Sequence, residues 1–210
     1  MSIIETASFV HVHVPPTTAG DDRTILLLHG TGGNERDLLE LGVAVAPGTR
    51  LLGVRGQVLE GGAPRFFRRM AEGVFDEADI IRRAADLAAF VPAAAATYGF
   101  DPKSVTALGF SNGANIAAAM LLLHPGVLAG AIMLRSMVPL VPATPPDLTG
   151  TRALMIQGLS DPLIPRENAE RLAAMLQGAG ASVSVEWQQG GHGLTPADVP
   201  LARTWLSAQG

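Results

Sequence analysis

The chain has 210 residues, of which 48% are hydrophobic and 16% charged, and its formal net charge at pH 7 is −4. These values are typical of one compact domain, residues 1–210, and they exclude a disordered chain and a basic surface for nucleic acid. Because the chain contains no cysteine, disulfides, thiolate metal sites and a cysteine nucleophile are excluded as well.

Residues 1–14 contain no lysine or arginine and no long apolar stretch, so we expect no secretory signal. Uninterrupted apolar runs, such as residues 87–96, are too short to span a membrane. We therefore expect a cytoplasmic protein without a membrane span.

Apolar runs typical of strands alternate with helical patterns along the whole chain. In chain order, the patterns predict an edge strand at 8–14, a strand at 24–29, a helix at 34–46, a strand at 50–54, an irregular stretch at 56–76, a helix at 79–98, a strand at 104–108, a helix at 114–123, a strand at 130–134, a proline-rich loop at 139–150, a strand at 152–156, a helix at 166–177, a strand at 182–187 and a helix at 196–208. Asn34 is expected to cap the first helix, Pro92 to kink or break the second, and Gly178 to end the fourth. This alternation predicts an α/β fold, in which a mostly parallel sheet of about seven strands carries helices on both faces.

The segment Gly109-Phe110-Ser111-Asn112-Gly113 lies where a predicted strand turns into a predicted helix. In this setting the pattern Gly-x-Ser-x-Gly is typical of a nucleophile elbow, because the glycines permit a tight bend that exposes the serine hydroxyl. The first N–H groups of the following helix favour negative charge that develops beside the serine. Ser111 is therefore the candidate nucleophile.

An elbow serine needs a base, which follows it along the chain in this fold class. Downstream of Ser111 the chain has two histidines, His124 and His192. His124 ends the predicted helix, so we expect it to cap that helix. His192 lies in a glycine-flanked loop after the last strand, where a base can reach over the edge of the sheet. We expect His192 to be the base.

The same arrangement needs an acid that orients the base. Asp161 lies in the loop that leaves the predicted strand 152–156, which favours it for this role. Asp147, in the proline-rich loop, is the reserve candidate. Glu186 falls inside a strand, and Asp198 is expected to be a solvated acid in the first turn of the last helix.

A second glycine cluster, residues 28–34, follows the first buried strand. A dinucleotide-binding loop would need glycine at the position of Glu35, so the cluster does not match that motif. We expect it to supply half of an oxyanion hole instead, with the backbone N–H groups of Thr31 and Asn112 holding the oxygen that becomes negative.

The other histidines suggest no metal site. His29 is expected to be a structural hydrogen-bonding residue, and His11 and His13 to form a solvated face of the edge strand. No third ligand accompanies that pair, and no sequence spacing typical of a metal site occurs. We expect neither a metal nor a cofactor.

The blocks at 28–35, 109–113, 158–162 and 191–192 resemble the α/β-hydrolase superfamily, specifically its small phospholipase/carboxylesterase group near the dienelactone hydrolases. The tracts at 53–56, 64–69 and 73–75 are similar to those of a bacterial branch of hydrolases, some members of which are associated with aromatic or quinone metabolism. The resemblance implies a three-layer α/β-hydrolase sandwich without a large lid domain, and a homodimer would fit the family. The chain departs from the family at Asn112, where glutamine is usual, and at Gln157, where histidine is frequent.

Together, the residues and the resemblance predict a serine esterase that acts on small-molecule esters, aromatic-pathway esters among them. Ser111 would form an acyl-enzyme, with His192 as base and Asp161 as the orienting acid, and activity should rise with pH as His192 loses its proton. A thioesterase or acyltransferase would use the same triad. A non-catalytic protein of this fold that binds a small ligand is the remaining alternative.

Substrate selection is expected to come from residues 57–76, the stretch long enough to cover the site. Phe66 and Phe67, with Met70, are predicted to form an apolar wall. Arg55 and Arg69, or their neighbours Arg65 and Arg68, are candidates to meet a carboxylate of the substrate. The alternative is that these arginines pair with nearby acidic residues on the surface.

Overall fold

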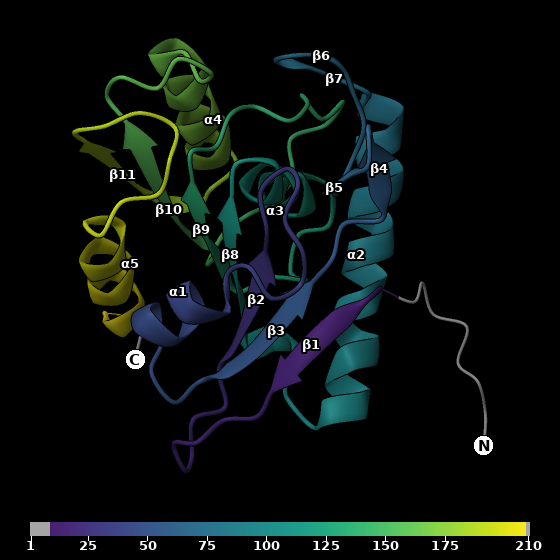
Figure 1. The fold of residues 1–210 in the computed structure, drawn as a ribbon, viewed down its shortest axis with the longest axis vertical. Coiled ribbons are helices and arrows are strands. Elements are labelled where there is room, and N and C mark those ends of the chain that lie inside the picture. Colours follow the sequence, from purple (N-terminus) through teal and green to yellow (C-terminus); the bar gives the residue numbers. More distant parts are fainter. Residues whose placement is uncertain (1–8, 209–210) are drawn as a thin grey trace.

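The computed structural model describes residues 9–208, and its centre is a seven-stranded sheet (Figure 1). In spatial order the strands are β1 (His11–Val14), β3 (Arg50–Val54), β2 (Thr24–Leu28), β8 (Val105–Phe110), β9 (Gly130–Leu134), β10 (Arg152–Gly158) and β11 (Ser182–Gln188). β1 pairs antiparallel with β3, and every other pairing in this sheet is parallel. The predicted mostly parallel α/β sheet is confirmed.

Helices cover both faces of the sheet. The helices α1 (Leu39–Val45) and α5 (Asp198–Ser207) lie together on one face, as Figure 1 shows. The other face carries α2 (Glu77–Tyr98), α3 (Asn112–Leu123) and α4 (Arg166–Gly178). Within residues 9–208, no helix is both long and apolar enough to cross a membrane.

The sheet divides the core into two apolar layers because successive side chains of a strand point to opposite faces. In β2, Leu26 and Leu28 join the larger layer under α2, α3 and α4, while Ile25 and Leu27 join the smaller layer under α1 and α5. Burial on both faces explains why this strand is a continuous apolar run in the sequence.

The irregular stretch at 56–76 contains two small hairpins. The first pairs β4 (Val58–Glu60) with β5 (Ala63–Arg65), and the second pairs β6 (Arg69–Ala71) with β7 (Val74–Phe75). These hairpins lie beyond the main sheet, next to the N-terminal end of α2 (Figure 1).

Two helices differ from the sequence-based expectation at their ends. α1 begins at Leu39 rather than Asn34, because the Asn34 side chain accepts a hydrogen bond from the Arg36 N–H and forms a turn there. α4 continues through Gly178, and the left-handed glycine that follows is Gly180, at φ 98°.

Pro92 does not break α2, which runs unbroken from its N-cap Asp76 to the left-handed Gly99. Proline removes one backbone hydrogen bond of the helix. The side chains around it, Phe90 and Val91 among them, are buried against the core, and this tertiary packing holds the helix together.

The predicted edge strand at 8–14 begins at His11 in the structure, and Ser8 lies outside the described residues. Its histidines do not form a solvated face. His11 hydrogen-bonds the Tyr98 hydroxyl at 2.6 Å, and the His13 ring stacks on Tyr98 with a centroid separation of 4.1 Å. Burial against α2 lowers the pKa of His13.

Candidate active site

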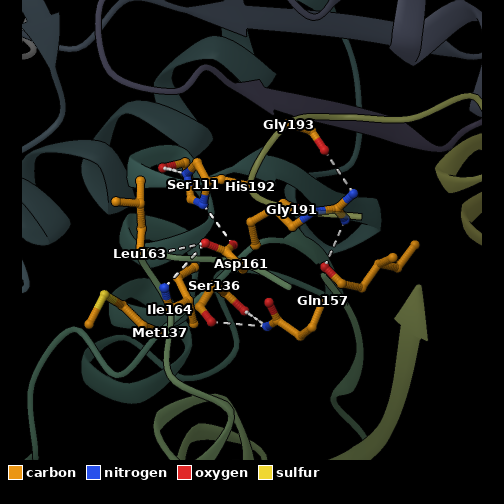
Figure 2. Close-up of polar contacts among 12 residues, drawn as sticks. Ser111, Ser136, Met137, Gln157, Asp161, Leu163, Ile164, Gly191, His192 and Gly193 are labelled. Atoms are coloured by element: carbon orange, nitrogen blue, oxygen red, sulfur yellow. Dashed lines mark hydrogen bonds and ion pairs between the residues drawn. The ribbon is translucent and has the colours of Figure 1, made fainter. Parts of the chain in front are cut away.

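Three side chains from separate loops meet above the carboxyl ends of the parallel strands. Ser111 follows β8, Asp161 follows β10 and His192 follows β11. The His192 Nε2 atom lies 2.8 Å from the Ser111 Oγ atom, and its Nδ1 atom lies 2.8 Å from the Asp161 Oδ2 atom (Figure 2). The structure therefore brings together the three residues that the sequence singled out as nucleophile, base and acid.

The backbone at Ser111 has the strained geometry of an elbow, with φ 52° and ψ −115°. Its N–H donates to the Leu134 carbonyl of the neighbouring strand at 2.8 Å. The flanking glycines are required by close packing, because a Cβ atom at Gly109 would lie 2.5 Å from the Gly113 carbonyl oxygen. A Cβ atom at Gly113 would overlap the Leu28 carbonyl of β2. The motif thus exists because strand and helix approach too closely for any side chain.

Backbone N–H groups of its own loop fix the orientation of the Asp161 carboxylate. Its Oδ1 atom accepts the N–H groups of Leu163 at 2.8 Å and Ile164 at 3.2 Å, which leaves Oδ2 for His192 (Figure 2). A carboxylate has no proton to give, so Nδ1 of His192 must donate and Nε2 must accept. The reserve candidate Asp147 instead accepts the Thr149 N–H at an exposed turn.

A buried ion pair fixes the loop that carries His192. Arg135 has no exposed surface and donates to both carboxylate oxygens of Asp198, at 2.9 and 3.0 Å. The same guanidinium donates to the carbonyls of Gly191 at 3.3 Å and Gly193 at 3.0 Å, on either side of the histidine. The prediction that Asp198 is a solvated acid is wrong, because its partner comes from a distant part of the chain that helix periodicity cannot indicate.

The end of β10 completes the support of this loop. A Cβ atom at Gly158 would overlap the Gly191 carbonyl, so the strand and the histidine loop approach too closely for a side chain. Gln157 is buried and donates 2.9 Å hydrogen bonds to the carbonyl and hydroxyl oxygens of Ser136 (Figure 2).

Two backbone N–H groups are available as the oxyanion hole. Neither the Thr31 nor the Asn112 N–H has a hydrogen-bond partner among residues 9–208, and both residues line the pocket of Ser111. The side chains of these two residues are held in place by residues of the 57–76 segment. The Thr31 hydroxyl oxygen accepts from Arg65 at 2.7 Å, and the Asn112 side-chain oxygen accepts the Phe66 N–H at 2.7 Å.

His29, next to this loop, is structural, as the sequence led us to expect. Its Nε2 atom accepts the Gly56 N–H at 2.9 Å, and its Nδ1 atom donates to the Gly30 carbonyl at 2.6 Å. Burial lowers the pKa of His29, so the imidazole is held neutral with both nitrogens occupied.

The pocket beside Ser111 has a volume of about 220 Å³. Its walls combine apolar side chains, including Phe75, Phe110 and Ile164, with the polar side chains of Arg65 and Asn115. Sequence reasoning did not single out Asn115, since an asparagine inside an apolar helix carries no motif.

The residues expected to select the substrate lie in different places. Arg69 lines the pocket, while its Nε atom donates to Glu60 at 2.6 Å. Arg55 does not line it and pairs with Glu35 at 2.6 Å. Phe66 and Phe67 are buried in the core behind the pocket wall, where they support the loop rather than contact the cavity.

The middle of the 57–76 segment is fixed by hydrogen bonds. Arg65 donates to the Thr31 hydroxyl and the Phe66 N–H donates to the Asn112 side chain, and the Arg68 N–H donates to Asp79 of α2 at 2.8 Å. The β6–β7 hairpin that follows projects outward, and Met70 on it is 74% exposed. Met70 does not line the pocket.

Comparisons with known proteins show what the whole chain is similar to. The sequence profile of the phospholipase/carboxylesterase family matches residues 66–209. MhqD of Bacillus subtilis (strain 168), provisionally named a hydrolase, is 50% identical to this chain over 88% of this chain and 92% of the MhqD chain. A Bacillus cereus carboxylesterase is 42% identical with a TM-score of 0.92, over 95% of this chain and 94% of its own. YahD, in a structure with malic acid, is 26% identical with a TM-score of 0.90, over 97% of this chain and 100% of its own.

Proposed function

The chain belongs to the phospholipase/carboxylesterase family of α/β-hydrolases, and from this premise we propose that it hydrolyses small carboxylic esters through an acyl-enzyme on Ser111. The observation that carries the proposal is the unbroken chain of hydrogen bonds from Asp161 through His192 to the Ser111 hydroxyl. No described group other than His192 lies within hydrogen-bond reach of that hydroxyl.

In the first step the Ser111 Oγ atom attacks the ester carbonyl, while His192 Nε2 takes the hydroxyl proton. Asp161 stabilises the imidazolium that forms. The bond to the alcohol then breaks as His192 gives the proton to the departing oxygen, which leaves an acyl group on Ser111. Water repeats the attack with His192 again as base, and the acid product leaves.

The negative charge on the carbonyl oxygen is met by the N–H groups of Thr31 and Asn112. The Asn112 N–H opens α3, so the helix dipole adds to the same stabilisation. Arg65 and Phe66 already hold the side chains of Thr31 and Asn112 in place. The two backbone donors therefore need no rearrangement during the reaction.

The pocket supports a small substrate. A pocket of about 220 Å³ is small for a ligand site, which supports esters with short acyl chains. Malic acid, the molecule in the YahD structure, is also small. The rings of Phe75 and Phe110 in the wall support aromatic esters as part of the substrate range.

The test is hydrolysis of p-nitrophenyl esters of increasing acyl length by the wild type and by Ser111→Ala, with Ser207→Ala in α5 as the matched control. We expect the wild type and the control to prefer short chains and Ser111→Ala to lose at least about 10³-fold in kcat. Circular dichroism establishes that all three proteins fold. Turnover that survives in Ser111→Ala, or a folded wild type inactive on every ester, would contradict the proposal.

A further inference from the structure

We propose that the pocket beside Ser111 contains a subsite for a carboxylate, so that the preferred substrates are esters that carry a second, ionised acid group. The inference rests on the proposed esterase function. The subsite is formed by Arg65, Arg69 and the side-chain amides of Asn112 and Asn115, all of which line the pocket.

The two asparagines present donors to this pocket because their oxygens are occupied elsewhere. The Asn112 Oδ1 atom accepts the Phe66 N–H at 2.7 Å, and the Asn115 Oδ1 atom accepts the Met137 N–H at 2.9 Å. A backbone N–H requires an acceptor, so these bonds fix which way each amide is turned. The Asn112 NH₂ group is buried without a partner, and that of Asn115 donates to no other residue within 9–208.

The two arginines share a single carboxylate. Glu60 lies 3.3 Å from the Arg65 Nε atom and 2.6 Å from the Arg69 Nε atom. Two guanidinium groups against one acid leave a positive charge that this cluster does not neutralise. Arg65 is 3% exposed, and burial lowers its pKa because a buried cation is poorly solvated. An anion bound in the pocket would therefore stabilise the charged guanidinium group.

Glu72 is the acid that also lines the pocket, and it does not compensate this charge. It is exposed and forms no ion pair with another described residue, so water and salt screen it strongly. The buried Arg65 is screened far less.

A carboxylate fits these donors better than a neutral group does. Its two oxygens accept about four hydrogen bonds, and bonds from arginine to a carboxylate are roughly twice as strong as neutral ones. A carbonyl or amide in the same place would leave donors unpaired and the charge unbalanced.

The test compares esters that match in size and differ in charge. One pair places the acid in the alcohol part (4-acetoxybenzoate against 4-acetoxybenzamide), and the other places it in the acyl part (4-nitrophenyl hemiadipate against its amide). In at least one pair we expect the wild type to have the higher kcat/KM for the acid. Arg69→Gln should lower that preference about tenfold, as loss of a charge-assisted hydrogen bond does. Arg68→Gln is the matched control, because it removes the same charge one residue away at a side chain outside the pocket.

A binding measurement separates this inference from the esterase proposal. Ser111→Ala cannot form the acyl-enzyme, so it binds the esters without turnover. Calorimetry on this variant therefore measures the affinity for 4-acetoxybenzoate, for 4-nitrophenyl hemiadipate and for the two matching amides. The subsite is supported if Ser111→Ala binds an acid more tightly than its amide and if adding Arg69→Gln to this variant abolishes that difference. This holds even if the wild type hydrolyses nothing. The inference is overturned if neither acid is preferred in turnover or binding, or if Arg68→Gln reduces the preference as much as Arg69→Gln.

Discussion

The buried pair of Arg135 and Asp198 gives a sharp prediction for the substitution Asp198→Asn. The change keeps the shape of the side chain and removes its charge, so Arg135 is left as a buried cation without a counter-ion. The Thr195 N–H, which the same carboxylate accepts at 2.6 Å, keeps an acceptor only if the new amide is turned correctly.

The expected loss of stability is large because neither partner reaches solvent. Arg135 is 0% and Asp198 1% exposed, and breaking a pair buried to this degree costs about 3–5 kcal/mol. For a chain of this length each kcal/mol lowers the Tm by about 2–4 °C, so the expected decrease is roughly 6–20 °C. The loosened loop also displaces His192, and a misplacement of about 1 Å can cost about 100-fold in rate. We expect kcat to fall at least about tenfold with little change in KM.

Stability is measured by denaturant and thermal unfolding, and kcat at a temperature well below both transitions. Asp147→Asn is the control, since it removes the same charge from an exposed turn. A double variant, Arg135→Met with Asp198→Leu, separates the two effects, because apolar replacement of a buried pair is often neutral for stability. We expect it to recover only part of the stability, because the Gly191 and Gly193 carbonyls lose their donor, and none of the kcat. The reasoning is refuted if Asp198→Asn loses no more stability than the control, or if kcat is restored in the double variant.

Three further changes test other parts of the structure. Gly113→Ala forces a methyl group against a β2 carbonyl and should cost about 1–3 kcal/mol or prevent folding, whereas Gly178→Ala meets open space; equal denaturation midpoints would contradict this. Asp161→Asn should lower kcat about 10⁴-fold in a folded protein, because the amide favours the wrong imidazole tautomer; kcat within tenfold of the wild type would exclude that role. Burial lowers the pKa of His29, so below about pH 6.5 the unfolded chain takes up a proton that the folded one does not. The free energy of unfolding should therefore fall between pH 7 and 5, by up to about 1.4 kcal/mol per unit, and less so in His29→Asn; equal slopes would refute this.

The sequence predicted the sheet and the meeting of Ser111, Asp161 and His192 because both depend on local patterns. Each of these residues lies in the loop that leaves the end of a strand, and the carboxyl ends of parallel strands lie at one edge of the sheet. Glycines around the serine are likewise a local requirement of the turn. Chain order and strand ends were therefore enough to place the three side chains near one another.

Contacts between distant segments could not be predicted in this way. Arg135 and Asp198 are 63 positions apart, and no period or motif links them. Arg55 was one of several arginines predicted to meet a carboxylate of the substrate, yet its partner Glu35 comes from another loop. Asn112 departs from the family pattern at the elbow, and its bond to Phe66 became visible only with the position of the 57–76 segment.

The division of the 57–76 segment into a fixed part and a projecting hairpin has a consequence for how such a protein can diversify. Its fixed part is hydrogen-bonded to Thr31 and Asn112, so changes there would disturb the two residues that we propose hold the oxyanion. The projecting β6–β7 hairpin supplies Arg69, Glu72 and Phe75 to the pocket without a hydrogen bond to the nucleophile, base or acid. Insertions or exchanges in that hairpin can alter which ester is accepted and leave the hydrolytic steps intact, which makes it the natural place to graft a new specificity.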